Sequence, residues 1–301
     1  MVEVLTADNH YIEITNTKKV LFPEDGFTKR DLIQYYQDIA PFMLPHLEGR
    51  PLTMHRFPSG IGEEGFYHKE VPEYFPSWIK RVELGKKDGR TRYLICNNTA
   101  TLIYIANLAC ITPHVWLSRN DRIAYPDMII FDLDPSDDDF EKVRQATFYL
   151  RDLLNELNLS SVIKTTGSRG VHIIIPLDRR IIFDKVRVIA RKIAGIMAVR
   201  YPEIVTVEQR KNKRGNRVYI DTQRNSYGQT AVAPYAIRAK HGAPVATPIS
   251  WEELKNPELN PQSYNIENIF KRLSEKKNVW ADWLDHPNSL TKTLKKLEEL
   301  K

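Results

Sequence analysis

Three aspartates in two short segments have the residue type and spacing needed for metal-assisted chemistry. Asp132 and Asp134 lie in MIIFDLDPS (128–136), and Asp221 lies in RVYIDTQRN (217–225). The residues before Asp132 are apolar and β-prone, which predicts a buried strand with Asp132 and Asp134 on one face. Neighbouring buried carboxylates repel each other, and a divalent cation such as Mg²⁺ or Mn²⁺ relieves that repulsion because it prefers hard oxygen ligands.

A second β-like run, Arg217 to Ile220, ends at Asp221 and makes this residue the candidate third ligand. Three carboxylates around two metal ions suit phosphoryl transfer by in-line displacement. Two other interpretations of FDLDPS are open. One is a solvated strand end before a turn at Pro135-Ser136-Asp137. The other is the phosphatase pattern of the haloacid dehalogenases, which lies near the chain start in most such enzymes and continues differently.

A glycine-rich turn follows the aspartate pair. KTTGSRGVHIIIP (164–176) predicts a tight turn at Gly167-Ser168-Arg169-Gly170 between two β-like runs. Its glycines let the backbone approach a ligand closely, and the Ser168 hydroxyl and Arg169 guanidinium suit phosphate. An ordinary β-hairpin beside a half-buried His172 is the alternative. With a carboxylate pair one crossover away, an anionic substrate bound through metal is the better explanation.

Four segments in a fixed order connect these motifs to a known family. They are FDLDPS (131–136), TTGSRGVH (165–172), VYIDTQRN (218–225) and TAVAPYAIR (230–238). In this order they resemble the polymerase domain of the bacterial non-homologous end-joining ligase called ligase D, and still more its stand-alone archaeal version. Both belong to the archaeo-eukaryotic primase superfamily. The resemblance runs from TNTKKVLFPEDGFTKRDLIQYY (15–36) past PISWEEL (248–254).

The resemblance implies roles for individual residues of the active site. It implies metal ligands at Asp132, Asp134 and Asp221. It implies contacts to the incoming nucleotide from His114, Thr166, Ser168, Arg169, His172 and Arg238. Relatives commonly have lysine at the position of Arg169 and glutamine at that of Arg224, so the nucleotide contacts at these two positions are left open.

The resemblance also implies a DNA-end site near the N-terminus. Asn16, Lys19 and Lys29 match positions that bind the 5′-phosphate of a recessed DNA end. Phe66 and Tyr67 match aromatic residues that pack against the bases beside that phosphate, although without the resemblance both would be expected in the core. A short loop can bring the three polar residues to a helix N-terminus, where backbone N–H groups favour an anion.

Composition and charge agree with an anionic partner. The chain has 301 residues, 42% of them hydrophobic, and a net charge of +6. Five of its basic residues fall in EQRKNKRGNR (208–217), which is expected to be a hairpin loop before Asp221 that contacts nucleic-acid backbone, or else a solvated loop. Cys96 and Cys110 are expected to be reduced core residues of a cytoplasmic protein. No secretory signal, transmembrane segment or zinc-spaced cysteine cluster is expected.

One further motif resembles a different enzyme. Lys86-Lys87-Asp88-Gly89 matches the start of the covalent motif of DNA ligases, in which the lysine accepts AMP. Asp-Gly between two β-like runs is also a strong hairpin signal, and the arginine expected two residues after the glycine is replaced by Thr91. A hairpin turn is the favoured interpretation.

The periodicity predicts the elements that position these residues. Thr28 and Asp31 form a capping-box pattern before a helix that ends near Leu44. Further helices are expected at 99–109, 136–157 and 183–200, and the part after Trp251 is expected to be helical and to end in a helix at 290–301. Strands are expected at 52–57, 79–84, 91–96 and 161–165. The expected fold is α+β, a single compact primase-polymerase catalytic domain at 1–285 with a mixed β-sheet and flanking helices, followed by a C-terminal helical tail at 286–301.

These features predict a template-dependent nucleotidyltransferase that fills gaps and extends DNA ends. The resemblance implies two ions, Mn²⁺ or Mg²⁺, a nucleoside triphosphate as substrate and a preference for ribonucleotides. It also implies DNA with gaps or 3′ overhangs and a 5′-phosphate, a separate ATP-dependent DNA ligase and the Ku end-binding protein as partners, with no membrane partner. A replicative primase subunit and a non-catalytic DNA-end bridging protein are the alternatives.

Overall fold

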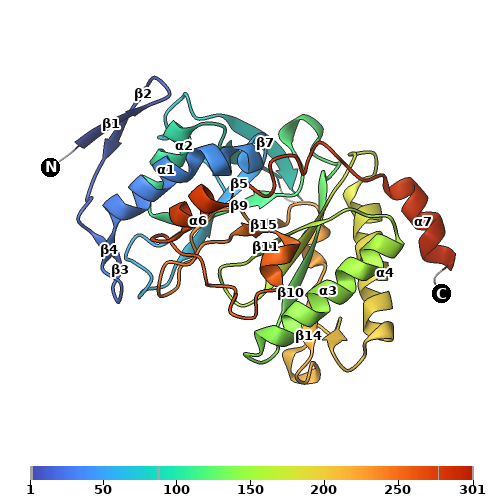
Figure 1. Cartoon of the computed structure of the whole chain (residues 1–301). Helices are drawn as coiled ribbons and strands as arrows, with labels where there is room; N and C mark the ends of the chain where they lie inside the picture. The colour runs from blue at the N-terminus through green and yellow to red at the C-terminus, as the bar shows by residue number, and fades with distance from the viewer. Residues whose placement is uncertain (1–2, 87–88, 277, 300–301) are drawn as a thin grey trace. The chain divides into compact units, whose positions relative to one another are not determined.

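The described part of the chain divides into two units, each with its own sheet (Figure 1). The computed structural model of the protein describes residues 3–86, 89–276 and 278–299. Unit 1 comprises Met1–Asp121, Thr230–Ala246 and Asn265–Ile269, and unit 2 comprises Arg122–Gln229, Thr247–Tyr264 and Phe270–Lys301. The α+β class is confirmed, whereas the expected division into 1–285 and a tail stays a prediction.

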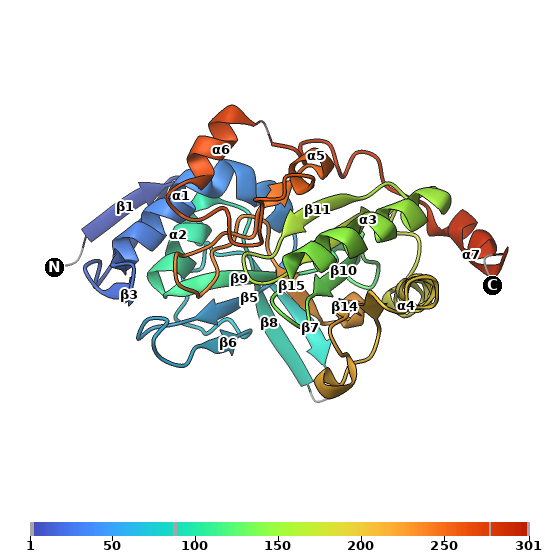
Figure 2. The same cartoon turned by 60° about the horizontal axis from the view of Figure 1, so that its bottom comes forward.

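Unit 1 is built on an antiparallel sheet. Its strands are β1 (Glu3–Ala7), β2 (His10–Ile14), β3 (Val20–Phe22), β4 (Phe27–Thr28), β5 (Pro51–Arg56), β6 (Phe66–His68), β7 (Arg81–Lys86), β8 (Gly89–Ile95), β9 (Cys110–Trp116) and β15 (Thr230–Val232). Its helices are α1 (Lys29–Leu47) and α2 (Thr99–Asn107), which lie side by side (Figures 1 and 2). The sheet order is β15-β9-β5-β8-β7, with β6 paired to β5, and β1-β2 and β3-β4 form separate pairs.

The start of α1 follows directly from the sequence. The Thr28 backbone N–H donates to the Asp31 side chain at 2.7 Å, and the Thr28 hydroxyl in turn accepts from the Asp31 backbone N–H. This confirms the capping box. The helix runs three residues beyond the expected end at Leu44, through Pro41 and Pro45. α2 stops before the expected Ala109, because that residue adopts a left-handed φ of 57°.

Unit 2 is built on a mixed sheet with the order β13-β14-β10-β12-β11-β16. Its strands are β10 (Met128–Asp134), β11 (Val162–Thr165), β12 (Val171–Pro176), β13 (Val205–Thr206), β14 (Val218–Asp221) and β16 (Pro248–Ile249). Its α-helices are α3 (Phe140–Glu156), α4 (Phe183–Arg200), α5 (Trp251–Leu254) and α7 (Leu290–Glu299), and its short 3-10 turns are η2 (Lys211–Lys213) and η3 (Gln223–Asn225). Two further elements, η1 (Asn120–Arg122) and α6 (Ile269–Glu275), have residues in both units. α3 connects β10 to β11 as the expected crossover, and β12 lies between these two strands.

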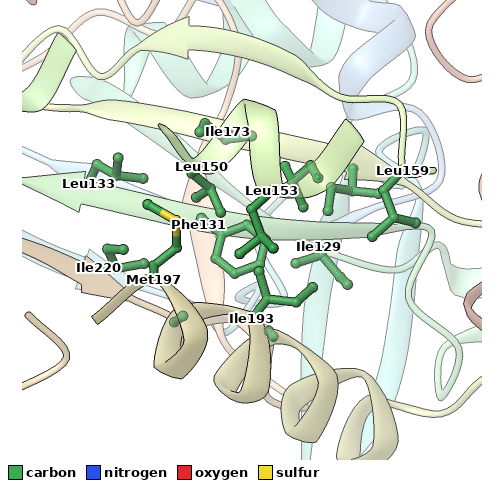
Figure 3. Packing of buried hydrophobic residues seen from close by; sticks show 14 of the residues in the cluster. Ile129, Phe131, Leu133, Leu150, Leu153, Leu159, Ile173, Ile193, Met197 and Ile220 are labelled. Carbon is green, nitrogen blue, oxygen red and sulfur yellow. The ribbon is translucent and has the colours of Figure 1, made fainter. Parts of the chain in front are cut away.

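The core of unit 2 lies on one face of this sheet. Alternation along β10 sends Ile129, Phe131 and Leu133 to the face that α3 and α4 cover (Figure 3). Figure 3 shows Phe131 beside Leu153 of α3 and Ile193 of α4. The apolar side chains of β10 therefore anchor the strand, and the alternate positions, which include both aspartates, face the opposite side.

Several elements differ from the sequence-based expectation. α3 begins at Phe140 rather than at Ser136, because the Asp139 carboxylate caps the Glu141 N–H at 3.0 Å while the Ser136 hydroxyl donates to the Arg217 carbonyl. The part after Trp251 is only partly helical, since α5, α6 and α7 are separated by irregular chain.

The basic segment 208–217 is not the loop of a hairpin, which corrects the expectation. β13 pairs with β14 in parallel, so the intervening chain crosses over rather than turning back. Arg214 donates to the Glu208 carbonyl at 3.0 Å, and Arg217 donates to the Lys213 carbonyl at 3.0 Å. Two of its basic side chains therefore hold the loop together.

Other expectations in unit 1 can be compared directly. Cys96 and Cys110 are free and buried, and burial raises the pKa of both thiols. β7 and β8 pair with Lys86 opposite Gly89, as expected for a hairpin, while Lys87 and Asp88 of the ligase-like motif lie outside the described residues. No helix in the described part is long and apolar enough to cross a membrane.

Candidate active site

Four polar side chains form a row across four strands of unit 2. Asp132 of β10 lies directly opposite Asp221 of β14 on one side and His172 of β12 on the other. His172 in turn lies opposite Lys164 of β11. Directly opposed residues project to the same face of a sheet, so the row Asp221–Asp132–His172–Lys164 lines the face opposite the α3–α4 core.

Asp134 lies on the same face of the sheet as this row, because it follows Asp132 by two residues on the same strand. Burial, together with the negative charge of Asp132, raises the pKa of Asp134 to about 7. Burial also raises the pKa of Asp221. Ionisation of Asp134 and Asp221 is therefore less favourable in this site than in water.

The negative charge of Asp132 is balanced by neighbouring side chains of the protein. Arg224 Nε donates to its Oδ2 at 3.0 Å, and His172 Nε2 lies 3.3 Å from its Oδ1. Burial opposes ionisation of Asp132, but these two neighbours lower its pKa below the ordinary value. Burial lowers the pKa of His172 to about 4, so the imidazole is neutral at pH 7 and Arg224 is the counter-ion.

The donor set fits a divalent cation. Three carboxylates on one sheet face offer the hard oxygen ligands that Mg²⁺ and Mn²⁺ prefer. Within residues 3–86, 89–276 and 278–299, no group of three or more His, Cys, Asp or Glu side chains is already gathered into a metal cage. Asp132 instead points its oxygens at Arg224 and His172.

The glycine-rich turn packs against the aspartate strand. Thr166 organises the turn, because its hydroxyl donates to the Gly170 carbonyl at 3.1 Å and accepts from the Ser168 and Gly170 N–H groups. A Cβ on Gly170 would lie 2.0 Å from the Leu133 carbonyl oxygen. Gly170 therefore permits close approach to β10, while close approach of the turn to a ligand stays a prediction.

Ser168 and Arg169 lie at the tip of this turn. The Ser168 carbonyl accepts from Gln262 Nε2 at 2.8 Å, and Ser168 itself is half-buried. Arg169 is exposed and donates to the carbonyls of Pro135 and Asp137 at 2.6 and 3.0 Å. These bonds tie the turn to the loop after Asp134, and nucleotide contacts of Ser168 and Arg169 stay predictions.

The other two predicted nucleotide-binding residues belong to unit 1. His114 of β9 is buried, and its ring lies 6.2 Å from His55 and 5.5 Å from Tyr67. The rings of His55 and Tyr67 stack, with centroids 4.3 Å apart. Burial and the positive charge of Arg238 lower the pKa of His55, so Arg238 belongs to the same cluster.

The predicted 5′-phosphate residues are brought together in unit 1. The Lys19 N–H donates to the Asn16 carbonyl at 2.9 Å, and the Lys29 N–H donates to the Lys19 carbonyl at 2.8 Å. Lys29 begins α1 and is only 6% exposed. Burial, then the charges of Lys19 and Arg56, lower the pKa of Lys29, and no carboxylate in the described part offsets them. A cluster of cations at a helix N-terminus is a setting that favours anion binding, and the 5′-phosphate contact of these residues stays a prediction.

Arg56 is a residue that the sequence did not single out. It lies opposite Phe66 in the β5–β6 pair, with its guanidinium carbon 5.4 Å from the Phe66 ring centroid. It also donates to the Leu108 carbonyl at 2.9 Å and contacts His68 Nδ1 at 3.0 Å. Phe66 and Tyr67 are 47% and 57% exposed, so the alternative that they are core residues is wrong. The strand pairing thus places Arg56 beside this aromatic pair, and its positive charge also acts on Lys29.

A family comparison decides what these clusters belong to. The model of the LigD primase-polymerase domain matches residues 28–280. The chain belongs to this family. The resemblance found in the motifs is thereby confirmed, and the match includes Lys29, Arg56 and the three aspartates.

Curated relatives and a solved structure agree with the family assignment. The multifunctional non-homologous end joining protein LigD of Mycolicibacterium smegmatis is 33% identical over 267 residues, which cover 88% of this chain and 35% of that protein. The bifunctional LigD of Bacillus subtilis is 28% identical over 92% of this chain and 44% of that protein. The polymerase domain of Mycobacterium tuberculosis ligase D, solved in complex with DNA, has a TM-score of 0.86 and 29% identity over 92% of this chain and 99% of that domain.

Family membership establishes the enzyme class. A LigD primase-polymerase domain is a metal-dependent nucleotidyltransferase that uses nucleoside triphosphates, so the expected class is confirmed. The chain spans between a third and a half of the length of the curated relatives just named. The family assignment does not identify the bound ions, the preferred sugar of the nucleotide or the partner proteins.

Proposed function

We propose that this nucleotidyltransferase adds nucleotides, directed by a template strand, to the 3′ end of broken or gapped DNA during end joining. Asp132, Asp134 and Asp221 hold two divalent ions, Mn²⁺ or Mg²⁺, in this proposal. The observation that carries it is the register that sets Asp132 opposite Asp221, with Asp134 on the same face. The similarity to a polymerase domain solved with DNA supports the choice of substrate.

The protein groups around the aspartates have distinct tasks. Bound ions would activate the primer 3′-hydroxyl and stabilise the departing pyrophosphate. His172, neutral and 2% exposed, orients Asp132 through Nε2. Ser168 and Arg169 at the tip of the glycine-rich turn bind the triphosphate and neutralise its charge rather than transfer protons, while nucleotide contacts of His114 and Arg238 stay predictions.

The Lys29 cluster binds the 5′-phosphate of the downstream strand. A terminal phosphate carries about one more negative charge than a backbone phosphate, so a cluster of cations distinguishes the two. Asn16, Lys19 and Lys29 supply the cluster, and Arg56 joins it to Phe66. Phe66 and the exposed Tyr67, backed by His55, offer ring faces on which bases stack.

The biological setting follows from the relatives. Proteins named for non-homologous end joining match most of this chain. We infer that the protein prefers ribonucleotides and works with Ku and with a separate ATP-dependent DNA ligase that seals the extended ends. The two cysteines of the chain are too few for a zinc cluster of four cysteines, which argues against the replicative primase alternative.

A primer-extension assay on gapped DNA tests this proposal. The substrate carries a one-nucleotide gap, a 5′-phosphate downstream and a labelled primer, with Mn²⁺ and each nucleotide supplied in turn. The proposal predicts addition of the nucleotide complementary to the template, and no product when the primer is omitted at the same enzyme concentration. Binding of the gapped DNA without any extension would instead support a DNA-end bridging protein.

A further inference from the structure

Arg224 occupies an oxygen atom that the proposed metal site needs. Its Nε donates to Asp132 Oδ2 at 3.0 Å. The Asp132 side chain is only 5% exposed, whereas that of Arg224 is 36% exposed, so the guanidinium approaches the carboxylate from the solvent side. A protein cation is thus paired with one of the three candidate metal ligands.

The turn that carries Arg224 is fixed on both sides of this residue. On one side, Asp221 Oδ1 accepts from the Gln223 N–H at 2.7 Å. On the other, Asn225 is fully buried and pairs with both backbone groups of Ile130, accepting from its N–H at 2.8 Å and donating to its carbonyl at 2.7 Å. Ile130 lies two residues before Asp132 on β10, so these bonds hold Arg224 beside that carboxylate.

A guanidinium and a metal ion cannot both use Asp132 Oδ2 as a close partner. Arg224 supplies one positive charge and no empty coordination position, whereas a divalent ion supplies two charges and bridges several oxygens. We infer that Arg224 is an internal cation that neutralises Asp132 in the metal-free protein and must release Oδ2 when an ion binds. The inference rests on the proposed metal site, and it makes Arg224 a competitor that weakens metal binding and a stabiliser of the metal-free fold.

Binding of Mn²⁺ to the protein without nucleotide or DNA tests this inference. Mn²⁺ affinity is measured by electron paramagnetic resonance, and thermal unfolding is followed with and without Mn²⁺. Arg224→Gln is expected to bind Mn²⁺ roughly three- to tenfold more tightly than wild type, because one charge-assisted hydrogen bond no longer has to be broken. Its metal-free midpoint falls, and the rise in midpoint on adding Mn²⁺ is larger than in wild type.

Two further variants make the result specific. Lys192→Gln removes one positive charge from the exposed face of α4 in the same unit, and it is expected to leave the affinity within about twofold of wild type. Arg224→Lys keeps the charge without the planar donor geometry, and it is expected to give an intermediate affinity and a fold closer to wild type in stability.

The outcomes separate this inference from the proposed function. Wild-type or weaker Mn²⁺ affinity in Arg224→Gln and in Arg224→Lys would overturn the competitor role while leaving the metal site in place. No Mn²⁺ binding by wild type, or binding that Asp134→Asn does not reduce, would overturn the metal site and the inference with it.

Discussion

Asp132 and Asp221 face each other directly across two antiparallel strands, although 88 residues separate them in the sequence. Directly opposed side chains in such a pair lie about 5 Å apart, and like charges at these positions destabilise a sheet. Burial of Asp132 increases that cost. The pair therefore opposes the stability of the fold, which is consistent with the proposed role of both residues as ligands of a cation.

Gly170→Ala is predicted to destabilise unit 2. The added Cβ would lie 2.0 Å from the Leu133 carbonyl oxygen, which belongs to the central strand β10 and cannot move without disturbing the aspartates. A loss of about 1–3 kcal/mol in unfolding free energy is expected, measured by urea unfolding. The matched control is Gly195→Ala in α4, where nothing lies within 4 Å and a gain of about 0.5–1 kcal/mol is expected. Equal stability of the two variants would contradict the close packing.

Removing the two lysines of the phosphate cluster is predicted to abolish selectivity for a 5′-phosphate. Lys19→Ala/Lys29→Ala should lower the affinity ratio of 5′-phosphate over 5′-hydroxyl gaps by a factor that corresponds to about 1–3 kcal/mol. Arg56→Gln should lower this affinity ratio less, because Arg56 lies against Phe66 and contributes only its positive charge near Lys29. Fluorescence anisotropy with the two gapped DNAs measures the ratio.

The same assay distinguishes this pocket from general DNA contacts. A lysine that only touches the DNA backbone should weaken both DNAs alike. If the double variant keeps the wild-type ratio and loses overall affinity, the phosphate pocket lies elsewhere.

Ribonucleotides are predicted to be incorporated more efficiently than deoxyribonucleotides. A site that hydrogen-bonds the 2′-hydroxyl leaves a polar group unpaired when that hydroxyl is missing, and this costs transition-state stabilisation. The comparison is kcat/KM for ATP and dATP opposite template thymine with Mn²⁺. Equal values, or a preference for dATP, would refute the proposed sugar choice.

The buried ion pair between Glu253 and Arg272 is predicted to make unit 2 sensitive to acid. Burial alone would raise the pKa of Glu253, but two bonds of 2.9 Å from Arg272 lower it below the ordinary value of 4.5. The pair therefore stabilises the fold fully above about pH 4.5, and this contribution is lost as the pH falls through the lowered pKa of the folded state.

Glu253→Gln is the matching test of that prediction. It should lower stability at pH 7, where wild type has the ionised pair, and the difference between the two proteins should shrink as the pH falls below about 4.5. Thermal unfolding from pH 7 to pH 3 measures this difference. A difference that stays constant over the whole range would contradict the assigned role of the pair.

The sequence predicted the fold best where local chemistry decides the structure. Thr28 and Asp31 cap α1 as expected, and α4 spans Phe183–Arg200 as its periodicity indicated. The expectation that β14 begins as the second arm of a hairpin was wrong, because parallel pairing with β13 depends on long-range packing and not on the intervening loop. Ser136 was chosen as a helix start from its residue type, whereas its hydroxyl bonds the distant Arg217 carbonyl.

The sequence named the candidate residues of the site, but it did not predict which of them lie opposite or contact one another. Alternation alone places Asp132 and Asp134 on one face, whereas the position of Asp221 opposite Asp132 depends on strand register, which the sequence does not specify. Arg56 and Lys164 join their clusters only through strand pairing, and no local motif marks them. The contact of Arg224 with Asp132 likewise depends on the turn that Asn225 holds.

The most direct test of the account is single-turnover extension of gapped DNA by Asp132→Ala and Asp134→Ala, with gel-shift affinity measured on the same substrate. Loss of a metal-binding carboxylate is predicted to lower the extension rate on the order of a thousandfold or more, because the reaction depends on charge stabilisation at that point. DNA affinity is predicted to stay within about threefold of wild type, since these side chains bind metal and not the DNA backbone. Extension at or near the wild-type rate by either variant would contradict the central claim that these aspartates form the metal site of nucleotidyl transfer.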